Sequence, residues 1–193
     1  MSTNNIFRIG GISAFLGLGF TLADLVITGT TSPDNVSLFS KLMNSAAALT
    51  IIPLVLALYQ LFRIKAPTFS LVSVVEGISA VVLFVICMLI LNLQPLVLYN
   101  FAFMAVYYLP PMLFGLLAYQ QPQSGMPRAL NVIGIVTGVV AIIRYVVLTM
   151  GGGDWMNLPA SLAPLAFILY LTATVLALVW LVWTGILVLR HKE

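Results

Sequence analysis

Long runs without charged residues constrain this chain more than any other feature of its sequence. Residues 42–62, 77–127 and 155–189 contain no Asp, Glu, Lys or Arg. A membrane-spanning helix needs roughly 20 apolar residues, so each run is long enough to cross a bilayer. Of all residues 7% are charged and 62% are hydrophobic, whereas soluble domains carry about 25% charged residues. The sequence therefore predicts an integral membrane protein that has the lipid bilayer as its solvent.

Six hydrophobic segments follow from the breaks in this pattern. Each segment is apolar on every face, which is typical of membrane helices, whereas barrel strands alternate polar and apolar residues. Pro, Gly, Asn and Asp gather between the segments, as expected of connectors. We therefore predict an all-α polytopic membrane protein, a single domain built as a bundle of six transmembrane helices. The predicted helices are residues 6–28, 43–62, 69–93, 96–119, 129–150 and 160–189.

The distribution of basic residues predicts the orientation of the bundle. After six crossings both ends of the chain lie on one side of the membrane, and Lys41 is the one basic residue near the opposite side. Cytoplasmic segments are enriched in Lys and Arg, so we predict that both termini are cytoplasmic. The basic residues on the side of the termini are Arg8, Arg63, Lys65, Arg128, Arg190 and Lys192.

Length and composition exclude several classes of function. The longest connector, residues 29–44, is too short for a hydrophobic core of its own, which excludes soluble nucleotide-binding, nucleic-acid-binding and catalytic domains. The chain has one histidine, His191, and one cysteine, Cys87, so we expect no metal site and no cofactor. No assembled nucleophile motif is present in the sequence. Catalysis is therefore the least favoured class of function.

Three ionisable side chains lie inside the predicted helices and are the first candidates for a functional site. Asp24, Glu76 and Arg144 each carry a charge that costs about 2.5 to 3.5 kcal/mol near the bilayer centre. Asp24 follows Arg8 by 16 residues, and Arg144 follows Arg128 by 16, so the two opposite charges reach equal depth. One interpretation is a structural ion pair that fixes the helix orientation. The other is a site in which one of the charges binds a charged ligand.

Small residues on the first and fifth helices predict a close contact between them. The fifth helix has Gly134 and Gly138 in a GxxxG spacing, and the first has a small-residue stripe that ends at Asp24. Small residues let membrane helices approach closely, which would bring Asp24 next to Arg144. The other residues of the stripe are Gly10, Ser13, Gly17 and Thr21.

Glu76 in the third helix has no basic residue at a matching depth. Burial without a counter-charge favours the neutral form of a carboxyl, and Tyr59 near the end of the second helix is a candidate hydrogen-bond partner. The structural interpretation is a protonated carboxyl that bonds neighbouring helices. The functional interpretation is a carboxylate that carries a proton or binds a ligand.

The middle of the fourth helix contains Tyr107 and Tyr108, followed closely by Pro110 and Pro111. The two prolines lack two backbone donors and are expected to kink the helix, which leaves two carbonyls without their helical partners. Such carbonyls bind water, hydroxyls or cations, and broken helices line sites in many transporters. Kinked helices also serve packing alone, so both interpretations stay open.

Several short patterns are spread over nearly the whole chain. They are Arg8-Ile9-Gly10-Gly11-Ile12, Ala57-Leu58-Tyr59-Gln60-Leu61-Phe62-Arg63, Glu76-Gly77, Phe114-Gly115, Tyr119, Gly125-Met126-Pro127-Arg128-Ala129-Leu130 and Leu178-Val179-Trp180-Leu181-Val182-Trp183-Thr184-Gly185. Together they resemble a bacterial family of multi-span membrane proteins called domain of unknown function 4386. Asn131 stands where that family would have glycine. The resemblance implies six helices in a bacterial cytoplasmic membrane and carries no established activity.

Two classes of function remain. The favoured class is a non-catalytic binding, sensory or accessory membrane component, with a small apolar or lipid-like molecule as its ligand. The alternative is a small proton-linked transporter or carrier that uses Glu76, Asp24 and Arg144. The two halves of the sequence show no convincing inverted repeat, which counts against transport. The candidate intramembrane polar site comprises Asp24, Glu76, Arg144, Tyr59, Tyr107 and Tyr108.

Overall fold

The computed structural model describes residues 3–30, 38–91, 97–121, 125–153 and 158–191. Every regular element in these ranges is a helix, and six helical spans are long and apolar enough to cross a membrane. This confirms the predicted all-helical architecture and the number of spans. The elements are α1 (Thr3–Thr30), α2 (Leu38–Leu49), α3 (Ile51–Phe62), α4 (Pro67–Val85), the π-helix η1 (Ile86–Ile90), α5 (Val97–Tyr107), α6 (Leu109–Gln120), α7 (Arg128–Met150) and α8 (Ala163–Arg190).

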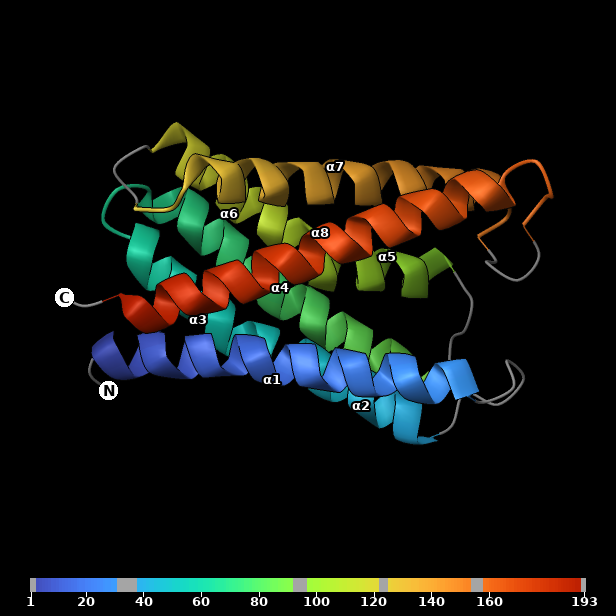
Figure 1. Cartoon of the computed structure of the whole chain (residues 1–193), viewed down its shortest axis with the longest axis horizontal. Helices are drawn as coiled ribbons and strands as arrows, with labels where there is room; N and C mark the ends of the chain where they lie inside the picture. The colour runs from blue at the N-terminus through green and yellow to red at the C-terminus, as the bar shows by residue number, and fades with distance from the viewer. Residues whose placement is uncertain (1–2, 31–37, 92–96, 122–124, 154–157, 192–193) are drawn as a thin grey trace.

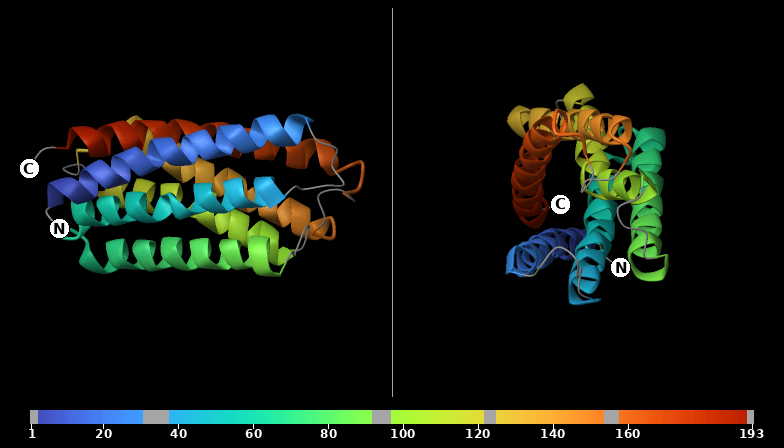
Figure 2. Two further views of the ribbon diagram at one scale, coloured as in Figure 1. Left: turned by 90° about the horizontal axis from the view of Figure 1, so that it is seen from below. Right: turned by 90° about the vertical axis from the view of Figure 1, so that its right-hand side faces the viewer.

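The six spans run up and down along one axis (Figure 1). α1 begins and α8 ends at the same end of the bundle, which we call the near end. The opposite end, where α1 ends and α8 begins, is the far end. Side by side, α1 and α8 form one side of the bundle, and α4 lies on the other side (Figure 2).

Three helix starts differ from the sequence prediction by three residues or more, and the first of these is α1, which begins at Thr3 and not at residue 6. The second span begins at Leu38 and not at residue 43, because Lys41 is accommodated near a helix end, where a long basic side chain can extend toward a polar boundary. The last helix begins at Ala163 and not at residue 160, because Pro164 occupies its first turn, where a missing N–H costs nothing. The predicted boundaries at residues 93 and 96 lie outside the described residues.

Two spans are interrupted by short breaks. The break at Tyr108 separates α5 from α6 directly before Pro110 and Pro111, as expected of residues that lack an N–H donor. A second break at Thr50 separates α2 from α3, three residues before Pro53, and the sequence analysis did not predict it. The Thr50 hydroxyl donates to the Ala47 carbonyl at 2.6 Å, which partly replaces the regular helical bonding at this point.

The small residues of the first and fifth helices do not face one another, so the predicted contact between these helices is wrong. A Cβ at Gly10 would overlap Ala57 of α3, so the stripe on α1 packs against the second span. A Cβ at Gly134 would overlap the carbonyl oxygen of Pro111, and one at Gly138 would overlap Met112. The glycines of α7 therefore let its backbone pack closely against α6, because small residues allow helices of this kind to approach one another.

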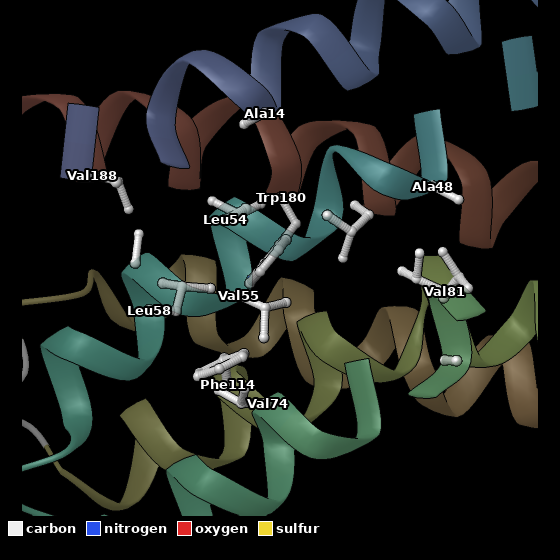
Figure 3. Packing of buried hydrophobic residues seen from close by; sticks show 14 of the residues in the cluster. Ala14, Ala48, Leu54, Val55, Leu58, Val74, Val81, Phe114, Trp180 and Val188 are labelled. Carbon is white, nitrogen blue, oxygen red and sulfur yellow. The ribbon is translucent and has the colours of Figure 1, made fainter. Parts of the chain in front are cut away.

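A hydrophobic core fills the middle of the bundle. Trp180 of α8 is 2% exposed and lies beside Leu54 and Val55 of α3 (Figure 3). Phe114 of α6 and Val74 of α4 extend the same cluster on the side away from α1.

Candidate functional site

A cavity of about 450 Å³ lies within the bundle and receives lining residues from all six spans. Its volume lies in the range of about 300 to 1,000 Å³ that small-molecule sites occupy. The charged and most hydroxyl-bearing lining residues lie toward the far end, together with Met88, Phe103 and Phe167, and the lining in the middle of the bundle is mostly apolar. The arrangement suits a molecule that is polar at one end and apolar at the other.

Asp24 and Arg144 both line this cavity at matching depth. Asp24 lies six residues before Thr30, the last residue of α1, and Arg144 lies six residues before Met150, the last residue of α7. At about 1.5 Å per residue, each charge is about 9 Å from the far end of its helix. Asp24 and Arg144 thus line one cavity at similar distances from the ends of their helices, and a direct ion pair between them stays a prediction.

Asp24 belongs to a series of hydrogen bonds that joins three helices. The Ser40 hydroxyl at the start of α2 donates to the Asp24 carboxylate. The Asn44 side-chain amide donates to the Ser40 carbonyl at 3.0 Å, and the Tyr107 hydroxyl donates to the Asn44 carbonyl at 3.1 Å. The acidic side of the cavity is thus fixed by contacts from α2 and α5.

Arg144 is held on the other side of the cavity by aromatic rings. Its side chain is 6% exposed. The guanidinium carbon lies 4.9 Å from the ring centroid of Tyr170 and 5.9 Å from that of Phe103. A guanidinium over an aromatic face is attracted by about 2 kcal/mol when both groups are desolvated. These rings therefore help to offset the cost of burying the charge.

Both tyrosines of the fourth span line the cavity, although consecutive residues of an unbroken helix point to different faces. Tyr107 bonds to α2 as described, whereas the hydroxyl of Tyr108 forms a 3.1 Å hydrogen bond with the Thr174 hydroxyl of α8. Tyr108 has non-helical backbone angles, with φ −122° and ψ −27°. The break before the two prolines thus lets both rings face the cavity.

The start of α5 contributes two further residues near the charges. Tyr99 lines the same cavity as Asp24 and Arg144. Its neighbour Asn100 is 6% exposed and donates its side-chain amide to the Gly153 carbonyl at 2.8 Å. Gly153 has φ +79°, a backbone conformation that favours glycine. Asn100 therefore ties the start of α5 to the end of α7, which positions Tyr99.

The apolar part of the cavity lies deeper in the bundle. Its lining includes Leu54 and Val55 of α3, Pro111 of α6, and Ala177 and Trp180 of α8. Trp180 is ten residues along α8 from Tyr170, or about 15 Å at 1.5 Å per residue. The polar and apolar parts thus follow one another along the bundle axis.

Glu76 lies apart from this cavity. It is partly buried on α4 and is absent from the residues that line the cavity. Both of its carboxyl oxygens are buried without a hydrogen-bond partner among the described residues. The hydrogen bond suggested by the sequence between Tyr59 and Glu76 is therefore not formed, and Tyr59 does not line the cavity either.

Several residues of the site could not be identified from the sequence. They are uncharged side chains, most of them in long apolar runs, and polar ones of this kind are common in membrane helices as links between helices. Such residues are difficult to recognise as parts of a site in the sequence, and they can be recognised once the fold brings them together. The missed residues are Ser40, Asn44, Tyr99, Asn100, Phe103, Tyr170 and Thr174.

The groups at this site are able to bind a ligand. Within the described ranges, no group of three His, Cys, Asp or Glu residues gathers to hold a metal ion. The groups that face the cavity are one carboxylate, one guanidinium, several hydroxyls and aromatic rings, which can hold a ligand by charge and by hydrogen bonds. Comparison with models of protein families, with curated proteins and with solved structures found no match to this chain.

Proposed function

We propose that this chain is a non-catalytic integral membrane protein that binds a small amphipathic molecule in its central cavity. The observation that carries the proposal is the division of one cavity into a charged part near the far end and an apolar part in the middle of the bundle. A ligand with a polar head and an apolar tail matches both parts at once. Such binding serves a sensory or accessory role in a membrane.

The setting that we propose is the cytoplasmic membrane of a bacterium, with the near end in the cytoplasm. The excess of basic residues toward the near end supports this orientation, and the resemblance to the family called domain of unknown function 4386 supports the setting. The charged part of the cavity then lies in the outer half of the membrane. Membership of that family stays a prediction.

Labelling of single cysteines tests the orientation. Ile64 at the near end is 85% exposed and Ser161 at the far end is exposed, whereas the native Cys87 is buried. In intact cells a thiol reagent that cannot cross membranes is expected to label Ser161→Cys and to leave Ile64→Cys unlabelled until the cells are opened. The reverse pattern would show that the bundle is inserted the other way.

The proton-linked carrier is less well supported than the binding protein. A carrier that uses Glu76 together with Asp24 and Arg144 requires the three to share one pathway. Asp24 and Arg144 line the cavity and Glu76 does not. The two oxygens of Glu76 are buried in the packed bundle, which is the arrangement expected of a structural carboxyl.

A cavity-filling substitution tests the proposed function. Ala177 lines the cavity and Val175, two residues away on the same helix, is 56% exposed on the outer face of the bundle. Ala177→Phe is expected to fill the apolar part, and Val175→Phe is its matched control. The purified protein is incubated with three monoacyl lipids of one chain length, which are anionic, zwitterionic and neutral, and bound lipid is counted by native mass spectrometry.

The expected result is one lipid of at least one type bound per protein, with binding retained in Val175→Phe and lost in Ala177→Phe. The loss is expected because the larger side chain occupies the volume of the tail. Binding of none of the three lipids, or equal binding in both variants, would contradict the proposed function.

A further inference from the structure

The central cavity presents two opposite charges from different helices. Asp24 comes from α1, which packs against α2, α3 and α8, whereas Arg144 comes from α7, which packs against α5, α6 and α8. Tyr99 of α5 lines the same cavity. The cavity therefore has a negative group on one wall and a positive group on another, and both face the space that a ligand head would occupy.

Each charged group can bind a ligand and keep its contacts with the protein. A carboxylate accepts about four hydrogen bonds and a guanidinium donates five. Ser40 uses one acceptor position of Asp24. Tyr170 and Phe103 contact the guanidinium of Arg144 through their ring faces, whereas its N–H donors lie in the guanidinium plane and bind acceptors such as carboxylate or phosphate oxygens.

The two charged groups of the cavity select among ligand heads. A head with a single charge can make a charge-assisted hydrogen bond with one of the two groups, and a neutral head makes none. A head that carries one positive and one negative group can make such a bond with each of them.

We propose, on the basis of the proposed function, that the cavity recognises a zwitterionic head, with its ammonium group at Asp24 and its acidic group at Arg144. The apolar part of the cavity then holds the tail beside Ala177 and Trp180. The same head chemistry occurs in aminophospholipids and in free amino acids with apolar side chains. The tail distinguishes these two sources, because the free amino acid fills less of the apolar part.

Binding of a matched panel of heads to the wild-type protein tests the proposal. The probes are lysophosphatidylethanolamine, lysophosphatidylglycerol, a monoacylglycerol and a primary alkyl amine of the same chain length, together with free leucine. Dissociation constants are measured in nanodiscs by competition against labelled lysophosphatidylethanolamine. The zwitterionic lysolipid is expected to bind at least about ten-fold tighter than each of the other three lipids, which corresponds to one charge-assisted hydrogen bond.

The measurement with free leucine shows whether the zwitterionic head belongs to a lipid or to a free amino acid. Tighter binding of lysophosphatidylethanolamine than of leucine assigns the site to a lipid, whereas the reverse order assigns it to a free zwitterion, and either order supports the proposal. If the anionic, cationic or neutral lipid bound as tightly as the zwitterionic lipid or more tightly, the assignment of a zwitterionic head would be wrong, and the proposed function would still stand. Absence of binding by all probes would overturn both.

Substitutions that remove one of the two charges are expected to change which ligand head binds most tightly. Asp24→Asn removes the negative group and keeps Arg144, so lysophosphatidylglycerol is expected to bind about ten-fold tighter than in the wild type, and in Arg144→Gln the alkyl amine is expected to gain by the same factor. Arg128→Gln changes an exposed charge at the near end and serves as the control. The wild-type panel decides the question if either charge variant fails to fold, and an unchanged preference in folded variants would contradict the assignment.

Discussion

The hydroxyl of Ser40 donates a hydrogen bond to the carboxylate of Asp24 and so joins the start of α2 to α1. The bond forms because the second span begins at Leu38, earlier than the hydrophobic pattern indicated, and this start places Ser40 within the bundle at 2% exposure. The acid in α1 thus accepts a hydrogen bond from a side chain outside the predicted helix. The bond holds Asp24 at the wall of the cavity.

Ser40→Ala is expected to lower the free energy of unfolding, because it removes a hydrogen bond to a charged group, worth about 1.5 to 3 kcal/mol. Ser79→Ala, on the exposed face of α4, is the control and is expected to change little. Thermal unfolding in detergent provides the measurement. A loss that is equal in the two variants would contradict the role of Ser40.

Asp24 and Arg144 are expected to be energetically coupled across the cavity, because they have opposite charges at one depth. Asp24→Asn and Arg144→Gln are each expected to destabilise the protein by up to about 3 to 5 kcal/mol, the cost of leaving one buried charge uncompensated. The double substitution is expected to recover much of this loss. Additive losses in a double-mutant cycle of unfolding free energies would refute the coupling.

Glu76→Gln is expected to be nearly silent for folding. Both oxygens of Glu76 are buried without a hydrogen-bond partner among the described residues, a setting that disfavours the ionised form, and glutamine has almost the same shape as the protonated acid. Glu76→Ala is the comparison and is expected to destabilise the protein, because it leaves a void. If Glu76→Gln alone caused a large drop in the unfolding midpoint, an ionised and bonded Glu76 would be indicated instead.

Gly134→Ala is expected to destabilise the contact between α6 and α7. The added Cβ would overlap the Pro111 carbonyl oxygen, which is backbone and cannot rotate away, and overpacking of this kind costs about 1 to 3 kcal/mol. Gly19→Ala is the matched control, because a Cβ there has no atom within 4 Å. It is expected to leave stability unchanged or to raise it by up to about 1 kcal/mol, since alanine favours helix. Equal effects of the two substitutions on the unfolding midpoint would contradict the contact.

The architecture could be predicted from the sequence because hydrophobic length alone determines which segments can span a membrane. The break at Tyr108 was foreseeable for a similarly local reason, since Pro110 and Pro111 remove helical donors. The break near Pro53 was open to the same reasoning, but a single proline gives a weaker signal than a pair. Local chemistry along one helix was thus the dependable part of the prediction.

Contacts between helices were less predictable. Gly134 and Gly138 indicate a close partner but do not specify which one, and the partner is α6 and not α1. The polar residues around Asp24 and Arg144 come mainly from three other helices, α2, α5 and α8, among them Asn44 of α2 and Tyr170 of α8. Their meeting depends on the order of helices around the bundle, which no single segment of sequence encodes.

The central claim is that a ligand tail lies in the apolar part of the cavity beside Trp180, with its head toward the far end. The protein with Trp155→Phe and Trp183→Phe retains Trp180 as its one tryptophan, and Trp180 lines the cavity. Its fluorescence is measured in nanodiscs during titration with a lysophosphatidylethanolamine that is brominated near the end of its chain. Saturable quenching is expected, with reversal by the unbrominated lipid and loss in the Ala177→Phe background, whereas quenching that does not saturate or that survives Ala177→Phe would contradict the claim.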